Sequence, residues 1–185
     1  MRNIVLTLMA ASMIFAANML SVSSVDDDGA GNVTFTLSYS FADTVAGFQF
    51  DLLTDGIVSV TSAQDGDAGA AGMAMSTNPS GTILGFSMTL ATVGPGDGTL
   101  ITVTGTYDVA NNGTDASVYA YDSCLDDGVE GCGDGDTRLV LSDKYAQPLE
   151  CNFMGVNWMV GSSTLDNNSP EVYSYSLSSN YPNPF

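Results

Sequence analysis

Residues 47–60, GFQFDLLTDGIVSV, decide the fold. Phe48 and Phe50 alternate with polar residues, which is the period of a strand with one buried face. Residues 54–56, Thr-Asp-Gly, have the composition of a tight turn, and residues 57–60 are apolar enough for a second strand. The stretch therefore predicts a hairpin whose aromatic face points into the core of a β-protein.

Strands with the same alternation follow on both sides of this stretch. Residues 32–41 alternate without a break, and residues 82–92 and 99–109 predict a second hairpin around the glycine-rich turn at 94–98. In residues 82–92 one face carries Leu84, Phe86, Met88 and Leu90. Apolar runs at 117–121, 139–141 and 153–160 supply the last strands, while residues 65–80 predict a long loop with a short helical turn. The chain is expected to be all-β, an antiparallel two-sheet jelly-roll or immunoglobulin-like sandwich of about eight or nine strands.

These motifs resemble the cohesin-like modules of secreted bacterial proteins. The resemblance rests on residues 47–60, on ILGFS at 83–87 and on GPGDGTL at 94–100, and it covers roughly residues 25–160. It implies a jelly-roll fold and the binding of dockerin partners through one sheet face. No residue of this sequence matches a known binding position, so the resemblance assigns none.

The charge of the chain excludes two classes of partner. It has 21 acidic residues against 3 basic ones, Arg2, Arg138 and Lys144, and its net charge is -18. Binding to nucleic acid or to anionic lipid depends on clustered Lys and Arg, which this chain lacks. We therefore expect neither a nucleic-acid partner nor an anionic lipid partner. The N-terminal apolar run at residues 4–17 is too short for a stable membrane span.

The two ends of the chain differ from the middle. Residues 1–24 begin with one positive charge and continue with a short apolar run, which predicts a secretory signal peptide cleaved between residues 17 and 24. The alternative is an apolar strand or helix that is retained. The sandwich is then expected over residues 25–161, and residues 162–185 form a linker and a final motif. That motif resembles the start of the C-terminal sorting domains of surface-attached bacterial proteins, and it consists of Asn180, Tyr181, Pro182, Asn183, Pro184 and Phe185.

Export makes disulfide formation possible. Cys124 and Cys132 lie eight residues apart in a loop rich in Gly and Asp, so they would most simply pair with each other. Three cysteines allow three single pairings, and the sequence leaves open whether Cys151 is the true partner of one of them. No histidine is present to complete a zinc site.

Catalysis is not expected, because an active site needs a titratable group tuned near the working pH or a nucleophile beside a base. The chain has no histidine and one lysine, and its acidic pairs lie in hydrated loops. Calcium is the candidate ion, since hard cations bind closely spaced carboxylates. Residues 26–29 and 65–67 are candidate calcium loops beside the alternative of solvated turn aspartates. The preferred loop is 124–136, with Asp126, Asp127, Asp134 and Asp136 as ligands.

We therefore interpret the chain as an exported, non-catalytic structural or adhesion module at the cell surface. Its expected partner is another protein or further copies of itself, assembled into a filament or layer by strand addition. Residues 19–25 and 172–177 are the candidate donor strands. The alternative function is a carbohydrate-binding module that stacks sugars on Trp158 and the tyrosines at 119, 121, 173 and 175. The competing interpretation of these residues is ordinary aromatic packing.

Overall fold

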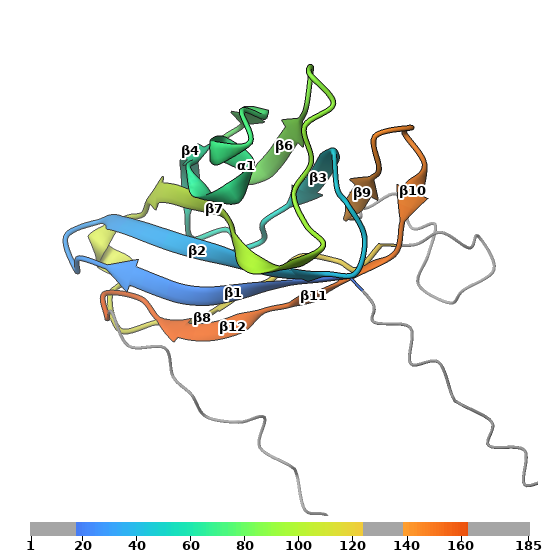
Figure 1. Ribbon diagram of the computed structural model, residues 1–185. Helices are drawn as coiled ribbons and strands as arrows, with labels where there is room; N and C mark the ends of the chain where they lie inside the picture. The colour runs from blue at the N-terminus through green and yellow to red at the C-terminus, as the bar shows by residue number, and fades with distance from the viewer. Residues whose placement is uncertain (1–17, 124–138, 163–185) are drawn as a thin grey trace, which may run out of the picture.

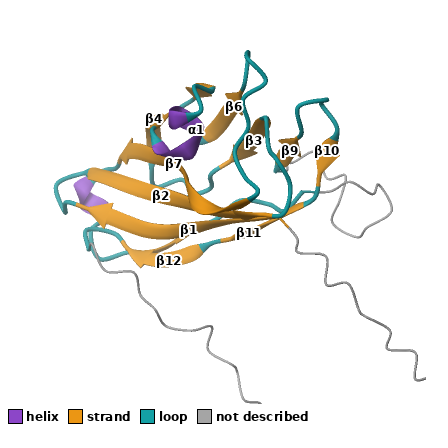
Figure 2. Cartoon of the chain, viewed as in Figure 1, coloured by secondary structure: helices purple, strands orange, loops and turns teal. Residues whose placement is uncertain are grey.

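The computed structural model describes residues 18–123 and 139–162, and these form a sandwich of two five-stranded sheets (Figures 1 and 2). We call them the β1 sheet and the β3 sheet. In order across the β1 sheet the strands are β11 (Cys151–Met154), β1 (Asn18–Asp27), β2 (Asn32–Phe41), β7 (Gly96–Thr106) and β4 (Ser59–Gln64). In order across the β3 sheet they are β10 (Pro148–Leu149), β9 (Val140–Ser142), β3 (Gly47–Asp51), β6 (Thr82–Phe86) and β5 (Ala74–Thr77).

Shorter elements complete the fold. A separate pair joins β8 (Asp115–Val118) to β12 (Val156–Met159), and a bridge between Leu53 and Tyr119 links the end of β8 to the chain after β3. The helix α1 (Gly66–Ala70) and a 3-10 turn (Val109–Asn111) are the helical segments of the described residues. Strand pairs are antiparallel except β1 with β11, which run parallel. The expected all-β two-sheet jelly-roll is confirmed, although the structure divides the strands more finely than the eight or nine expected.

The core lies between the sheets and follows the predicted alternation. On β2 every second residue from Val33 to Phe41 is buried, and on β3 Phe48 and Phe50 point inward, as expected. Trp158 of β12 is 1% exposed and meets Phe35 edge to face, with ring centroids 5.8 Å apart. An edge-to-face pair of this kind adds about 0.5–1.5 kcal/mol to the burial of the two rings.

Both predicted hairpins are wrong. β3 belongs to the β3 sheet but β4 belongs to the β1 sheet, and β6 and β7 are divided in the same way. After β3 the chain stays partly buried, because Leu52 and Thr54 point inward and Leu53 pairs with Tyr119 before the turn. Residues 54–56 do form a turn, as predicted, but this turn carries the chain from one sheet of the sandwich to the other.

The assignment of faces on residues 82–92 also needs correction. The strand ends at Phe86, and the inward residues of β6 are Ile83 and Gly85. The face with Leu84 and Phe86 points outward, and Met88 lies in the following loop. Gly85 is required inside because a Cβ there would approach the Phe48 ring to 2.2 Å.

The N-terminal boundary of the domain lies earlier than residue 25. β1 begins at Asn18 and occupies the interior of its sheet, between β11 and β2, with Leu20 and Val22 buried. The signal peptide itself remains a prediction, but only cleavage close to residue 17 leaves β1 whole. Residues 19–25 are also not free to act as a donor strand, because this stretch pairs with β2 and its residues 19–21 pair with β11 as well.

The segment 65–80 contains more structure than the predicted loop. Residues 66–70 form α1, as the expected helical turn, and residues 74–77 form β5. The carboxylate of Asp67 in α1 accepts a hydrogen bond of 2.9 Å from the Tyr39 hydroxyl. Burial and this carboxylate raise the pKa of Tyr39 to about 12.

A buried carboxylate ties three strands together at one end of the sandwich. Asp27, at the end of β1, accepts hydrogen bonds from the Tyr107 hydroxyl at 2.6 Å, from Trp158 Nε1 at 3.0 Å and from the Gly161 and Gly29 amides at 2.8 and 2.9 Å. Burial raises the pKa of Asp27, but the four donors outweigh burial and hold the pKa below its ordinary value. The same contact and burial raise the pKa of Tyr107 to about 12.

Residues 153–160 form two strands instead of one. β11 ends at Met154, and β12 begins after Gly155 and pairs with β8 instead of β1. Trp158 is buried, whereas Met154 is 56% exposed. Neither helix in the described ranges is long and apolar enough to cross a membrane.

Candidate docking face

The outer surface of the β3 sheet carries an apolar cluster that is exposed in the described part of the chain. Residues that pair across neighbouring strands share a face. The register places Leu84 of β6 beside Gln49 of β3 and Ser76 of β5, and it places Gln49 beside Val140 of β9. A second row runs parallel to the first, through Ala74, Phe86, Gly47, Ser142 and Pro148. We call this surface the apolar face.

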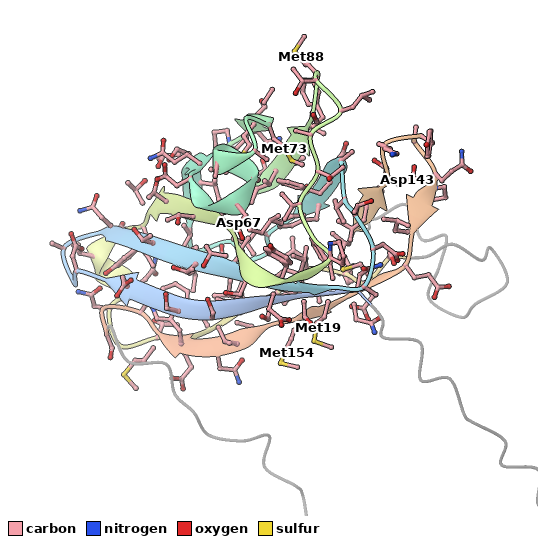
Figure 3. All side chains as sticks on the ribbon, in the orientation of Figure 1. Met19, Asp67, Met73, Met88, Asp143 and Met154 are labelled. Carbon is pink, nitrogen blue, oxygen red and sulfur yellow. The ribbon has the colours of Figure 1, made fainter. Side chains whose placement is uncertain are left out.

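Large apolar side chains on and beside this face are strongly exposed. Phe86 is 42% and Val140 is 50% exposed, and in the loop after β6 Met88 and Leu90 reach 81% and 66%. Figure 3 shows Met88 at the tip of this loop, well away from the β1 sheet. Clustered exposed apolar residues on a soluble protein mark a surface that another molecule covers.

The loop after β6 is anchored at its base. The Ser87 amide donates to the Ala46 carbonyl at 2.9 Å, and Val45 and Val93 exchange two backbone hydrogen bonds of 2.8 Å. Val93 is buried, whereas Met88 and Leu90 project beyond this clamp. The apolar tip is therefore held in place beside Phe86 instead of folding back on the core.

Few charges interrupt the apolar face. Among the outward positions of its five strands, Asp51 is the one charged residue. At the rim, the turn between β9 and β10 carries Lys144, whose Nζ lies 5.1 Å from the centre of the exposed Tyr145 ring. Aromatic residues with a nearby cation are typical of the centre and rim of protein interfaces.

Two polar atoms near this face lack partners within the described part of the chain. Asp51 Oδ1 and Ser87 Oγ are both buried and have no hydrogen-bond partner there. Buried polar atoms are nearly always paired in folded proteins, and an unpaired one costs about 1–3 kcal/mol. Both atoms belong to residues that adjoin the apolar cluster.

The outer surface of the β1 sheet is chemically different. Its central strands carry mostly hydroxyl side chains, and we call this surface the hydroxyl face. The outward residues of β1, β2 and β7 include Ser21, Ser23, Thr34, Thr36, Ser38, Ser40, Thr102, Thr104 and Thr106. Several of these hydroxyls satisfy one another, as Ser38 does with Ser23 at 2.8 Å and Ser62 of β4 with Thr104 at 2.7 Å.

The site residues expected from the sequence lie elsewhere. The predicted calcium ligands Asp126, Asp127, Asp134 and Asp136, the cysteines Cys124 and Cys132, and the sorting motif from Asn180 to Phe185 all fall outside the described residues. These expectations remain predictions. Within the described ranges, no group of three or more His, Cys, Asp or Glu side chains is placed to hold a metal ion.

The two other candidate calcium loops use their carboxylates inside the protein. Asp27 accepts four hydrogen bonds, and Asp28 accepts from the Ala30 and Asn32 amides and from the Asn32 side chain, which lowers the pKa of Asp28. The Asp67 carboxylate accepts a hydrogen bond from the Tyr39 hydroxyl. These contacts support the alternative that residues 26–29 and 65–67 are structural turns.

Cys151 and Trp158 are also structural, and the tyrosines at 173 and 175 lie outside the described residues. The Cys151 thiol is free and 1% exposed, and burial raises its pKa to about 12. Trp158 is too deeply buried to stack on a sugar, and Tyr119 and Tyr121 contact each other edge to face. Trp158 therefore packs in the core, and it offers no carbohydrate platform.

Comparison with known proteins identifies the architecture. No protein-family profile matches the chain, and no curated protein sequence matches it significantly. Solved structures do match, and they are cohesins. The fold is that of a cohesin-like module.

Three of these cohesins illustrate the likeness. A non-cellulosomal cohesin from the archaeon Archaeoglobus fulgidus superposes with a TM-score of 0.55 at 12% identity, covering 80% of this chain and 93% of its own. The cohesin of a type I cohesin-dockerin complex from Clostridium thermocellum gives 0.57 at 8% identity, covering 78% and 99%. The sixth cohesin of scaffoldin B from Acetivibrio cellulolyticus, solved in complex with a dockerin, gives 0.54 at 14% identity with the same coverage, 78% and 99%. At these identities the likeness shows the shared fold.

Sequence reasoning missed the apolar face altogether. In residues 82–90 the sequence places Leu84, Phe86, Met88 and Leu90 on one face, with Ile83 as the large apolar residue of the other. The face with more apolar residues looks like the core, and only the packing of Phe48 against Gly85 shows that the other face is inside.

Proposed function

We propose that this chain is an exported, non-catalytic module that binds a partner protein through the apolar face. The observation that carries the proposal is the cluster of Phe86, Met88, Leu90 and Val140, exposed by 42–81% on and beside one nearly uncharged sheet surface. The cohesin-like fold supports it, because two of the similar cohesins were solved in complex with dockerins. Docking would remove these side chains from water, which contributes about 25 cal/mol per Å² of apolar surface.

The partner we propose is a dockerin-like module, and the test is a binding titration. The purified protein is titrated by calorimetry with a panel of dockerin modules, including that of the Clostridium thermocellum complex. The double variant Phe86→Asp/Val140→Asp is expected to weaken binding at least about thirtyfold, because central interface residues commonly contribute 2 kcal/mol or more. The matched control Thr34→Asp/Ser40→Asp adds the same charge to the hydroxyl face and is expected to bind as the wild type does.

Two outcomes would contradict this proposal. Equal binding by both double variants would show that another surface carries the interaction. Loss of binding in both would trace the effect to added negative charge. Circular dichroism and a thermal melt of each variant establish that the fold is intact before binding is compared.

Assembly with copies of the same chain, in a surface filament or layer, is the finer alternative. Of the two candidate donor strands, residues 172–177 remain. The open edge of β11 is a poor acceptor, because the Cys151 amide and carbonyl bond to Ser123 and the Phe153 amide donates to Asp122. Negative-stain microscopy of native material from the cell surface tests this directly. Ordered fibres that disappear when residues 172–177 are deleted would establish strand exchange, and dispersed monomers would leave the partner-binding module.

A further inference from the structure

A pocket of about 460 Å³ opens at the end of the sandwich where the chain crosses between the sheets. One wall is the crossover itself, from Leu52 to Ser59. Pro79 and Ser80, from the turn between β5 and β6, form a second wall, and Tyr119 forms a third. The volume lies in the range of small-ligand pockets.

The walls are tied to one another by backbone hydrogen bonds. Leu53 and Tyr119 exchange two bonds of 2.7 and 3.0 Å, and the Leu52 amide donates to the Gly81 carbonyl at 2.9 Å. Within the crossover, Thr54 is buried and its carbonyl and hydroxyl accept from the Ile57 and Val58 amides at 2.9 and 3.2 Å. The pocket is therefore formed by connected elements before any ligand arrives, which reduces the entropy lost on binding.

The lining has one ionised group and an aromatic ring. Asp55 is the only charged residue that lines the pocket, and no basic residue does. Its Oδ2 atom accepts from the Ser117 amide at 2.8 Å, which restrains the carboxylate. The rest of the polar lining consists of hydroxyls and carbonyl oxygens, so the pocket offers many more acceptors than cationic donors.

We propose that this pocket binds an alkylammonium group. Asp55 and Tyr119 both line the pocket, and a carboxylate together with an aromatic ring is the combination of groups that recognises organic cations. The net charge of -18 raises the concentration of cations at the whole surface, whereas it opposes anionic ligands. Ile57 and Pro79 supply apolar contacts for an aliphatic stem. The group is either the head of a free alkylamine or a lysine side chain of a partner protein, and the site is independent of the apolar face.

The test is a titration of the ¹⁵N-labelled protein followed by amide NMR, with n-butylammonium as the probe. Saturable shifts are expected at Gly56, Ile57, Ser80 and Tyr119. Asp55→Asn is expected to weaken binding about tenfold, because it removes the charge while the new amide oxygen still accepts from Ser117. Asn also tolerates the positive φ of 53° at this position. The matched control is Asp115→Asn, which removes one charge from an exposed residue outside the lining.

Three results would overturn the proposal: no saturable shift, unchanged binding by Asp55→Asn, or equal shifts with the uncharged probes n-butanol and methyl glucoside. The last result would make the pocket a site for neutral polar ligands instead. A second arm separates the two sources of the ammonium group. A blocked Gly-Lys-Gly peptide that binds at least about tenfold more tightly than n-butylammonium would identify a protein lysine, because the pocket then also recognises the backbone beside it. Equal or weaker binding of the peptide would identify a free amine.

Discussion

The two outer faces of the sandwich use the same strand geometry for opposite purposes. On the hydroxyl face, long paired strands carry short polar side chains that bond to one another, such as Ser62 and Thr104 at 2.7 Å. On the apolar face the strands have five residues or fewer, and they expose Phe86 and Val140. The β1 sheet holds the fold together, and several of its hydroxyl side chains bond to one another. The β3 sheet offers side chains that water solvates poorly, so it is the surface a partner would stabilise.

The largest test of this comparison removes a strand from the β1 sheet. Deleting residues 18–24 is expected to abolish cooperative folding, because it removes the paired central part of β1 with Leu20 and Val22 from the core. Each such loss costs about 2–5 kcal/mol, and a domain of this size has about 5–15 kcal/mol in total. Urea unfolding followed by circular dichroism is the measurement. If the deletion variant folds, residues 18–24 are dispensable. That result would agree with their removal as part of a signal peptide or with their exchange between subunits.

The second test removes the Asp27 carboxylate, which ties β1 to Tyr107 and to Trp158 of β12. Asp27→Ala is expected to cost about 3–5 kcal/mol, because it leaves the Tyr107 hydroxyl, the Trp158 indole and two amides without their acceptor. The adjacent Asp26 is exposed, and Asp26→Ala is the matched control with an expected change within about 0.5 kcal/mol. The free energy of unfolding of each variant is measured with denaturant. If both variants lose a similar amount, the hydrogen bonds of Asp27 do not account for its stabilising effect.

The same residue predicts a pH dependence. The folded pKa of Asp27 lies below its ordinary value of 3.8, so its stabilising contribution is present above about pH 4 and is lost as the pH falls through the folded pKa. Asp27→Asn cannot titrate. We expect the difference in unfolding free energy between the wild type and Asp27→Asn to shrink between pH 7 and pH 2. A constant difference across that range would contradict the assignment.

A smaller test concerns the inner side of β6. Gly85→Ala is expected to destabilise the protein by about 1–3 kcal/mol, because the new methyl group would overlap the Phe48 ring. The same change at Gly69 in α1 meets its nearest neighbour, Met75 Cε, at 3.7 Å and is expected to be neutral or slightly stabilising. Thermal melts of the two variants compare them directly. Equal melting temperatures would place Leu84 and Phe86, instead of Ile83, inside the sandwich.

The smallest expected effect lies on the hydroxyl face. Thr104→Ala removes the hydroxyl that contacts Thr61 and Ser62, and it is expected to cost about 0.2–1 kcal/mol. The comparison residue is Thr82, an outward residue of β6, where Thr82→Ala loses only its contact with the Asn78 side chain. Unfolding free energies measured in urea resolve the pair. If Thr82→Ala lowers the free energy of unfolding more than Thr104→Ala does, the hydroxyl contacts of the β1 sheet are not the more stabilising ones.

Alternation of apolar residues predicted the strands and much of the core, because the period of two is a local property of the chain. β2 and the inward ring of Phe50 followed directly from it. The partner of each strand did not, since the Thr54-Asp55-Gly56 turn has the same composition whether the next strand joins the same sheet or the opposite one. β1 was assigned to the leader because its apolar residues continue a leader-like run, although Leu20 and Val22 already alternate with polar neighbours.

The candidate site was less predictable than the fold. The face of a strand with more apolar residues is ordinarily the buried one, so Leu84 and Phe86 looked like core residues, although Ile83 and Gly85 are the buried positions. The pocket depends on Tyr119 meeting Asp55 and Pro79 from distant parts of the chain. Such a meeting follows from the crossover between sheets, and no spacing in the sequence encodes it.

The parallel pairing of β1 with β11 determines how the domain would respond to a pulling force. β1 begins at one end of the sandwich and β12, which continues from β11, ends at the other (Figure 1). A force that draws Asn18 and Ser162 apart would therefore slide β1 along β11 and load their hydrogen bonds together in shear, instead of opening them one after another. This arrangement would favour resistance to extension over strand-by-strand unfolding.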